Sequence, residues 1–276
     1  MDAIDSRIGL NNGDPKIAAS NRGDRAARQD LPALAARLDR SLAKLHPSER
    51  LQQLRREVAG RIVFTTSFGL EDQAIFHLLC IHDIDVEIVT LDTGRLFTET
   101  HTLWAETEQR YRRRIGAVYP KHHDLELLIA KHGINGFYAS VEARVSCCHV
   151  RKVEPLNRAL AGANAWITGM RADQSQHRND IVLVSVDAER RLVKANPLFD
   201  WRREAVLDFT RESNVPINPL HATGFASISC APCTRAIRPG EPERAGRWWW
   251  EDGSKKECGL HVIAGNRQKA TAETGS

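Results

Sequence analysis

Cysteines stand at three separate places in the second half of the chain. The first two are an adjacent pair, Cys147–Cys148, and a Cys-x-x-Cys motif, Cys230–Cys233. Together they supply four thiolates, the number that a structural zinc ion or an iron–sulfur cluster takes. Cys258 stands alone near Lys256 and His261, and positive neighbours raise the thiolate fraction of a cysteine. The pattern predicts one metal site and one separate sulfur nucleophile.

A zinc ion and a cluster make different demands on adjacent cysteines. One zinc ion binds sulfur at about 2.3 Å, so its ligands must converge on one point. Neighbouring residues of a helix project roughly 100° apart, which suits a cubane better because each cysteine binds a different iron. Both metals remain open at this point, and the zinc reading would make the chain an interaction or thiolation-related module. Cys80 lies among Phe76, Leu79 and Ile81, and we assign it to the hydrophobic core.

Composition and charge limit the classes of function. The chain has 276 residues, 42% of them hydrophobic, and a formal net charge of +4, which allows a sizeable core and suits a small anionic substrate. The basic run 110–114 is typical of a solvated helix end, so we expect no nucleic-acid partner. We find no signal peptide and no apolar run near the ~20 residues of a membrane span. We therefore expect a cytoplasmic protein with no membrane partner; the sequence leaves room for a homo-oligomer.

Strands and helices alternate along the chain. We expect strands over residues 61–66, 86–91, 117–119 and 165–169, with a hairpin over 181–195. We expect helices over residues 31–58, 73–82, 98–114, 124–132 and 150–160. This order predicts an α/β fold with a mostly parallel sheet flanked by helices. Ligands bind outside the carboxyl ends of such strands, where Ser67, Leu91 and Gly169 stand, so we expect these residues to contact the substrate.

Several longer motifs point to one family. They are LDTGRLF (91–97), CCHVRK (147–152), ITGMRADQS (167–175), SISCAPCTRA (227–236), RAGRWWWE (244–251) and KECGLH (256–261). They resemble the assimilatory adenylylsulfate reductases, within the wider family that includes the phosphoadenylylsulfate reductases. The resemblance covers about residues 50–261. It implies an adenine nucleotide alpha-hydrolase-like fold, a phosphate loop at 67–72 and a 4Fe–4S cluster on the four paired cysteines.

The resemblance also implies a reaction, the thioredoxin-dependent reduction of adenosine 5'-phosphosulfate to sulfite and AMP in sulfate assimilation. Cys258 would attack the sulfur of the nucleotide and carry an S-sulfonate until thioredoxin or a glutaredoxin-like reductant releases sulfite. His261 would bind substrate or tune that thiol. The phosphosulfate would be neutralised by four cations, Lys152, Arg178, Arg244 and Arg247. The alternative is reduction of the 3'-phosphorylated nucleotide, whose reductases generally lack the cluster cysteines.

The same reading divides the chain into four parts. Residues 1–30 are polar and form a mobile arm, and residues 31–215 form the α/β sulfonucleotide-binding domain. Residues 216–261 lose regular periodicity and form an irregular segment that binds the cluster and carries Cys258 over the site. Residues 262–276 form a disordered tail.

Overall fold

A single sheet forms the centre of the molecule. The computed structural model describes residues 30–175, 178, 181–251 and 259–260. In this part of the chain six strands pair in the order β3-β2-β1-β4-β6-β5. They are β1 (Ile62–Thr66), β2 (Glu87–Leu91), β3 (Gly116–Val118), β4 (Ala165–Ile167), β5 (Val184–Asp187) and β6 (Leu192–Ala195). All neighbours are parallel except β5 and β6, which form the predicted hairpin.

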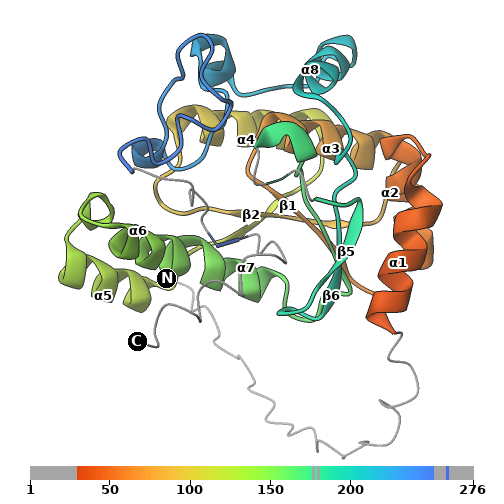
Figure 1. The fold of residues 1–276 in the computed structure, drawn as a ribbon, viewed down its shortest axis with the longest axis horizontal. Coiled ribbons are helices and arrows are strands. Elements are labelled where there is room, and N and C mark those ends of the chain that lie inside the picture. Colours follow the sequence, from red (N-terminus) through yellow and green to blue (C-terminus); the bar gives the residue numbers. More distant parts are fainter. Residues whose placement is uncertain (1–29, 176–177, 179–180, 252–258, 261–276) are drawn as a thin grey trace, which may run out of the picture.

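Helices cover both faces of the sheet. They are α1 (Leu31–Leu42), α2 (Pro47–Glu57), α3 (Leu70–Ile81), α4 (Thr98–Tyr111), α5 (His122–His132), α6 (Val141–Cys148), α7 (Glu154–Ala159) and α8 (Arg203–Glu212). Figure 1 shows α3, α4 and α8 on one face of the sheet and α7 on the other, with α5 and α6 beside α7. The predicted mostly parallel α/β architecture is confirmed.

Alternation along the strands sorts the apolar side chains between two cores. In β1, Ile62 and Phe64 join the larger core together with α1, α2 and α3, whereas Val63 joins the smaller core under α7. In β4, Trp166 likewise packs against Leu156 of α7. Successive strand residues point to opposite faces, so a buried sheet needs apolar residues at every position. This explains the continuous apolar runs that predicted the strands.

Some predicted helices differ from the observed ones. Residues 31–58 form two helices because the chain turns before Pro47, which occupies the first position of α2, and His46 caps that helix. Proline restricts its preceding residue to extended backbone and favours a helix start. Helix α3 begins at Leu70, three residues earlier than predicted, which places Glu71 and Asp72 in its first turn.

Two helical segments were absent from the sequence-based prediction. Helix α6 continues through a π-helical turn, η2 (His149–Val153), into α7, so the predicted helix 150–160 is the end of a longer one. Helix α8 buries Val206 and Thr210 on one face and carries charged residues on the other, so its amphipathic pattern was present in the sequence but was not recognised. The π-helical turn changes the direction of side chains directly after Cys147–Cys148.

The described part of the C-terminal segment, residues 216–251 and 259–260, contains short 3₁₀ turns. These are η5 (Pro219–Thr223) and η6 (Ala231–Cys233). A β-bridge joins Thr234 to Arg247. Figure 1 shows this segment, in blue, on the side of the molecule away from α1 and α2. The division of the chain at residue 215 stays a prediction.

Candidate active site

A cavity of about 190 Å³ lies at the carboxyl ends of β1, β2 and β4. The last strand residues, such as Thr66 and Leu91, form its floor, and the first turn of α3 forms one wall. Residues 226–229, Glu243, Arg244 and Arg247 of the C-terminal segment line it as well. The cavity therefore lies where a parallel sheet is expected to bind its ligand.

Most of the predicted substrate contacts meet at this cavity. The predicted contacts that line it are Ser67, Leu91, Lys152, Gly169, Arg178, Arg244 and Arg247. Cys258 and His261 lie outside the described residues. Leu260, which follows Cys258 by two positions in the sequence, is described and lines the same cavity. The structure thus brings together side chains from segments far apart in the chain, and their contact with substrate stays a prediction.

The loop before α3 is closed by its own carboxylate. The Ser67 N–H and hydroxyl both donate to Asp72 Oδ2, at 2.6 and 2.7 Å. Burial raises the pKa of Asp72 to about 6. A Cβ atom on Gly169 would lie 2.3 Å from Asp72 Oδ1, so only glycine allows β4 to approach the loop this closely. The loop, α3 and the end of β4 form one rigid wall.

Three of the predicted cations are buried. Lys152, Arg178 and Arg247 are between 6% and 9% exposed. The Arg247 guanidinium lies 4.7 Å from the Trp248 ring and donates to the Ser227 hydroxyl at 3.4 Å, while its buried Nε has no hydrogen-bond partner. Buried charge is costly without an opposite charge or hydrogen bonds. Three buried cations that line one cavity suit an anionic ligand.

The four paired cysteines line one small cavity next to this site. Cys147 and Cys148 come from the end of α6, and Cys230 and Cys233 flank η6. Phe137 and Trp248 pack against them, and Lys152 and Ser229 line both this cavity and the larger one. None of these four cysteines forms a disulfide bond. The sequence-based expectation that these cysteines come together is met in the structure.

Burial and neighbouring charge act differently on the thiols. Burial, together with nearby Cys230, raises the pKa of Cys233 to about 12. Burial also raises the pKa of Cys230, but Lys152 and the Thr93 hydroxyl outweigh it and the net shift is downward. Within the described ranges, no group of three or more His, Cys, Asp or Glu side chains is arranged to hold a metal ion. The thiols share a cavity without converging on one point.

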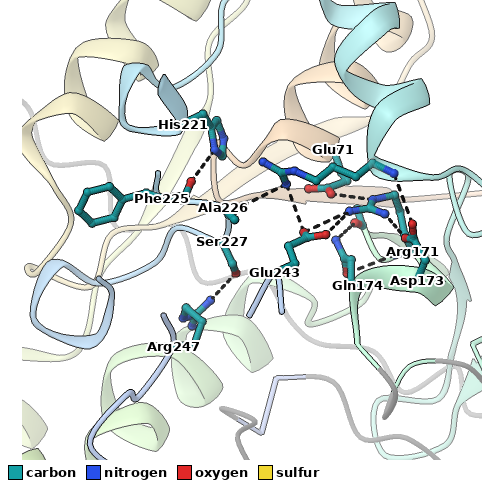
Figure 2. Close-up of polar contacts among 12 residues, drawn as sticks. Glu71, Arg171, Asp173, Gln174, His221, Phe225, Ala226, Ser227, Glu243 and Arg247 are labelled. Carbon is teal, nitrogen blue, oxygen red and sulfur yellow. Dashed lines mark hydrogen bonds and ion pairs between the residues drawn. The ribbon is translucent and has the colours of Figure 1, made fainter. Parts of the chain in front are cut away.

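The sequence-based analysis missed a set of charged side chains beside the cavity. Arg171 is fully buried and pairs with Glu71, Asp173 and Glu243, which Figure 2 shows around its guanidinium. Glu71 and Glu243 line the cavity. The one available signal was the position of Arg171 between Gly169 and Arg178 in a motif already assigned to the substrate.

His221 was also missed. It lines the cavity, and its Nδ1 lies 2.7 Å from the Phe225 carbonyl oxygen, so this nitrogen carries the proton and donates. Its Nε2 is buried and has no hydrogen-bond partner. Burial lowers the pKa of His221. The neutral imidazole therefore keeps Nε2 as a buried acceptor without a partner.

Comparisons with known proteins agree on one family. The family profile described as the phosphoadenosine phosphosulfate reductase domain matches residues 61–236. A protein of Agrobacterium fabrum named adenosine 5'-phosphosulfate reductase is 52% identical over 227 residues, which cover 82% of this chain and 87% of that protein. Proteins of the same name from Sinorhizobium fredii and Allochromatium vinosum are 51% and 49% identical, over 85% and 77% of this chain and 93% and 83% of their own lengths.

A solved structure supports the same conclusion. The phosphoadenylyl-sulfate reductase of Candida auris, in a phosphate complex, superposes with a TM-score of 0.63 at 25% identity, covering 74% of this chain and 96% of that chain. This likeness confirms the predicted adenine nucleotide alpha-hydrolase-like fold. With the matched profile and the relatives at about half identity, it follows that the chain belongs to the phosphoadenosine phosphosulfate reductase family.

Proposed function

We propose that this chain reduces adenosine 5'-phosphosulfate to sulfite and AMP in assimilatory sulfate reduction, with thioredoxin or a glutaredoxin-like dithiol as the electron donor. The main support for the proposal is the set of residues that line the cavity. Lys152, Arg178, Arg244 and Arg247 all line the cavity at the strand ends, and Leu260 brings the end of the Cys258 motif to the same place. The relatives named adenosine 5'-phosphosulfate reductase support the choice of substrate.

The proposed reaction has two stages that balance in atoms and electrons. The Cys258 thiolate attacks the sulfur of the sulfate group, an S–S bond forms, and AMP leaves with the electron pair of the broken S–O bond. A thiolate of the dithiol protein then attacks Cys258 Sγ, and sulfite leaves with the electrons of the S–S bond. The second thiol of the partner resolves the mixed disulfide, so Cys258 returns to the thiol and the partner becomes a disulfide.

The cations serve the first stage. A thiolate approaching a phosphosulfate brings one anion toward another, and fixed positive charges lower that barrier when they face the developing charge on AMP. Arg244 and Arg247 come from the C-terminal segment and Lys152 and Arg178 from the α/β part. Arginine suits phosphate and sulfate oxygens because it donates two parallel hydrogen bonds. We therefore assign these four side chains to the phosphosulfate.

The other walls suit the nucleoside. Leu91, Leu156 and Leu260 form an apolar part of the lining, and adenine is a flat group that gains from such contact. Ser67 and Gly169 lie at the neighbouring strand ends. We assign the base to the apolar wall and the ribose to the strand ends.

Negative charge in the cavity favours the nucleotide without a 3'-phosphate. The carboxylates of Glu71, Asp72 and Glu243 all line the cavity. An added phosphate would bring a dianion close to them, and like charges at short range in a partly buried site repel strongly. Because Glu71 and Glu243 are paired with arginines, this repulsion is only a secondary argument, and the preference for adenosine 5'-phosphosulfate rests mainly on the relatives of that name.

The cysteine cavity fits a 4Fe–4S cluster. Four thiols line it, and the buried Trp248 Nε1, which has no partner, belongs to a residue lining the same cavity and offers an N–H donor. Cys147, Cys148, Cys230 and Cys233 would hold one iron each. When bound, the cluster would supply fixed charge next to Lys152 and order the segment that carries Arg244. The electrons for sulfite come from the dithiol partner.

The reductant, the location and the assembly are part of the proposal. No helix in the described ranges is long and apolar enough to cross a membrane. A cytoplasmic location agrees with a reductant of the thioredoxin type and with the lack of disulfide bonds among the described cysteines. A homo-oligomer is compatible with the sequence.

Turnover of the two nucleotides tests the substrate. Purified protein with thioredoxin, thioredoxin reductase and NADPH should form sulfite from adenosine 5'-phosphosulfate at a kcat/KM at least tenfold above that for the 3'-phosphorylated nucleotide. A tenfold preference in the opposite direction refutes the substrate assignment.

Iron and acid-labile sulfide analysis of anaerobically purified protein tests the cofactor. We expect about four of each per chain. Zinc without sulfide would favour the interaction or thiolation-related module instead.

A further inference from the structure

Arg171 connects three segments through buried ion pairs. Its side chain is fully buried, its Nε donates to Glu71 Oε1 at 2.7 Å, and its Nη2 donates to Glu243 at 2.9 Å. Nη1 pairs with Asp173. Glu71 belongs to the first turn of α3, and Glu243 belongs to the C-terminal segment. Since Asp173 belongs to the same segment as Arg171, the guanidinium links that segment to α3 and to the C-terminal segment and fixes the three relative to one another.

Glu243 is the member of this network nearest to the predicted substrate arginines. It lines the cavity and directly precedes Arg244 in the sequence. A second arginine, Arg203 at the start of α8, pairs with it at 3.3 Å and also donates to the Ala226 carbonyl at 3.1 Å. A cation in the first turn of a helix opposes the helix dipole, so the position of Arg203 is better explained by its partners than by helix stability.

The turn after Glu243 is compact. Ala245 N–H donates to the Pro242 carbonyl and Arg247 N–H to the Arg244 carbonyl, at 2.9 and 3.0 Å. A Cβ on Gly246 would lie 2.2 Å from the Arg235 carbonyl oxygen, so this turn packs directly on residues 234–235. A small displacement at Glu243 would therefore move the turn as a unit.

We propose that Glu243 is a positioning residue: held by Arg171 and Arg203, it fixes the turn 242–247 so that Arg244 meets the phosphate of the bound nucleotide. The proposal rests on the function proposed above and adds a residue to it. Glu243 itself does not touch the reacting atoms. It acts through Arg244. The ion pair of Arg171 with Glu71 in turn links Glu243 to the first turn of α3, next to the predicted phosphate loop.

The charges of this network favour a positioning role for Glu243 over a role in anion binding or stability. Within this network three carboxylates, Glu71, Asp173 and Glu243, face two arginines, Arg171 and Arg203. Burial and the charge of Glu71 raise the pKa of Glu243. A carboxylate here weakens anion binding by simple electrostatics, and buried ion pairs contribute little net stability compared with apolar packing. The remaining contribution of Glu243 is to fix the position of the turn 242–247.

The test compares two glutamates of the same segment. Glu241 pairs with Arg235 near the surface and lines neither cavity, so Glu241→Gln should change kcat/KM less than twofold. Glu243→Gln should lower kcat/KM for adenosine 5'-phosphosulfate, and weaken AMP binding measured by calorimetry, by about 10- to 100-fold, as misplacement of a binding group does. An effect no larger than that of Glu241→Gln overturns the proposal.

A double-mutant cycle separates positioning from general stability. If Glu243 acts through Arg244, adding Glu243→Gln to Arg244→Ala should cost less than about threefold more, because the group it positions is gone. Full additivity would show a different role and overturn the proposal. Arg203→Gln, which leaves the buried pair with Arg171, serves as a second variant if Glu243→Gln folds poorly, with a smaller loss in the same direction.

The cycle is measured in AMP affinity as well as in turnover. A wild-type protein that binds AMP but does not reduce adenosine 5'-phosphosulfate refutes the proposed function. The AMP cycle still decides the role of Glu243 in that case, since it needs no reductant. The two claims therefore fail on different measurements.

Discussion

The sheet and the C-terminal segment 216–251 are built in different ways. The sheet buries alternating apolar side chains in two cores, with Phe64 and Trp166 almost fully enclosed. The segment has short 3₁₀ turns and relies on ion pairs, cysteines and tryptophans. Of the six buried side-chain atoms without a partner in the described ranges, four belong to this segment: His221 Nε2, Arg247 Nε, Trp248 Nε1 and Trp250 Nε1.

This difference shows which part of the molecule depends on its ligands. Buried donors and acceptors left unpaired cost roughly 1–3 kcal/mol each, whereas none of the unpartnered side-chain atoms belongs to a residue of the six described strands. Arg247 and Trp248 line the two adjoining cavities. We infer that the sheet is a complete scaffold and that the segment would be completed by the proposed nucleotide and cluster.

Replacement of a proposed cluster ligand should give the largest difference between the C-terminal segment and the sheet. Cys230→Ser should abolish sulfite formation and increase hydrogen exchange in residues 216–251, while exchange in β1 and β2 stays unchanged. Cys80→Ser is the matched control, because Cys80 lies on α3 against the larger core and should keep iron content and activity. Near wild-type activity of Cys230→Ser would contradict the comparison.

A substitution that leaves a cavity in the larger core should have the opposite effect: it should lower stability and leave nucleotide binding unchanged. Leu38 of α1 is fully buried in the larger core, and Leu38→Ala should lower the free energy of unfolding by about 2–5 kcal/mol. Urea denaturation measures this change. At a temperature where the variant stays folded, its KM for the nucleotide should equal that of the wild type. A changed KM would mean that the scaffold is not independent of the site.

Asp72 lies where the scaffold meets the cavity and should link stability to pH. Burial raises its pKa to about 6 from the ordinary value of 3.8. Between these values the folded protein keeps a proton that the unfolded chain releases, so the free energy of unfolding falls as pH rises through this window. At neutral pH the buried charge costs about 3 kcal/mol, at 1.36 kcal/mol for each pKa unit.

The variant Asp72→Asn removes that charge and tests the sign. Compared with the wild type it should gain about 3 kcal/mol near neutral pH and almost nothing near pH 4. Thermal or urea unfolding at both pH values measures the difference. An equal change at both pH values would show that lost hydrogen bonds from Ser67, and not the charge, set the stability of this loop.

The sequence predicted the scaffold better than the contacts that cross it. Buried strands such as 61–66 follow directly from apolar runs, and the hairpin near residues 181–195 follows from alternation around a polar turn. The break before Pro47 was missed because both halves of the predicted helix share the same apolar spacing. Proline was the local signal that should have ended the first half.

In the candidate site, motifs indicated the cysteines and cations but not the network around Arg171. Arg171 and Glu243 are 72 positions apart, and neither is unusual in its own segment. Periodicity describes neighbours along the chain, whereas these ion pairs depend on how β4, α8 and the turn 242–247 come together. Such contacts between distant segments could be recognised only from the three-dimensional structure.

Intact-protein and peptide mass spectrometry after mixing with adenosine 5'-phosphosulfate, in the absence of any reductant, tests the central claim most directly. We predict one added SO₃ group, on the peptide containing Cys258, that disappears when thioredoxin and its reducing system are supplied. The adduct should be absent from Cys258→Ser. An enzyme that forms sulfite when reductant is present but never carries this adduct on Cys258 would contradict the account.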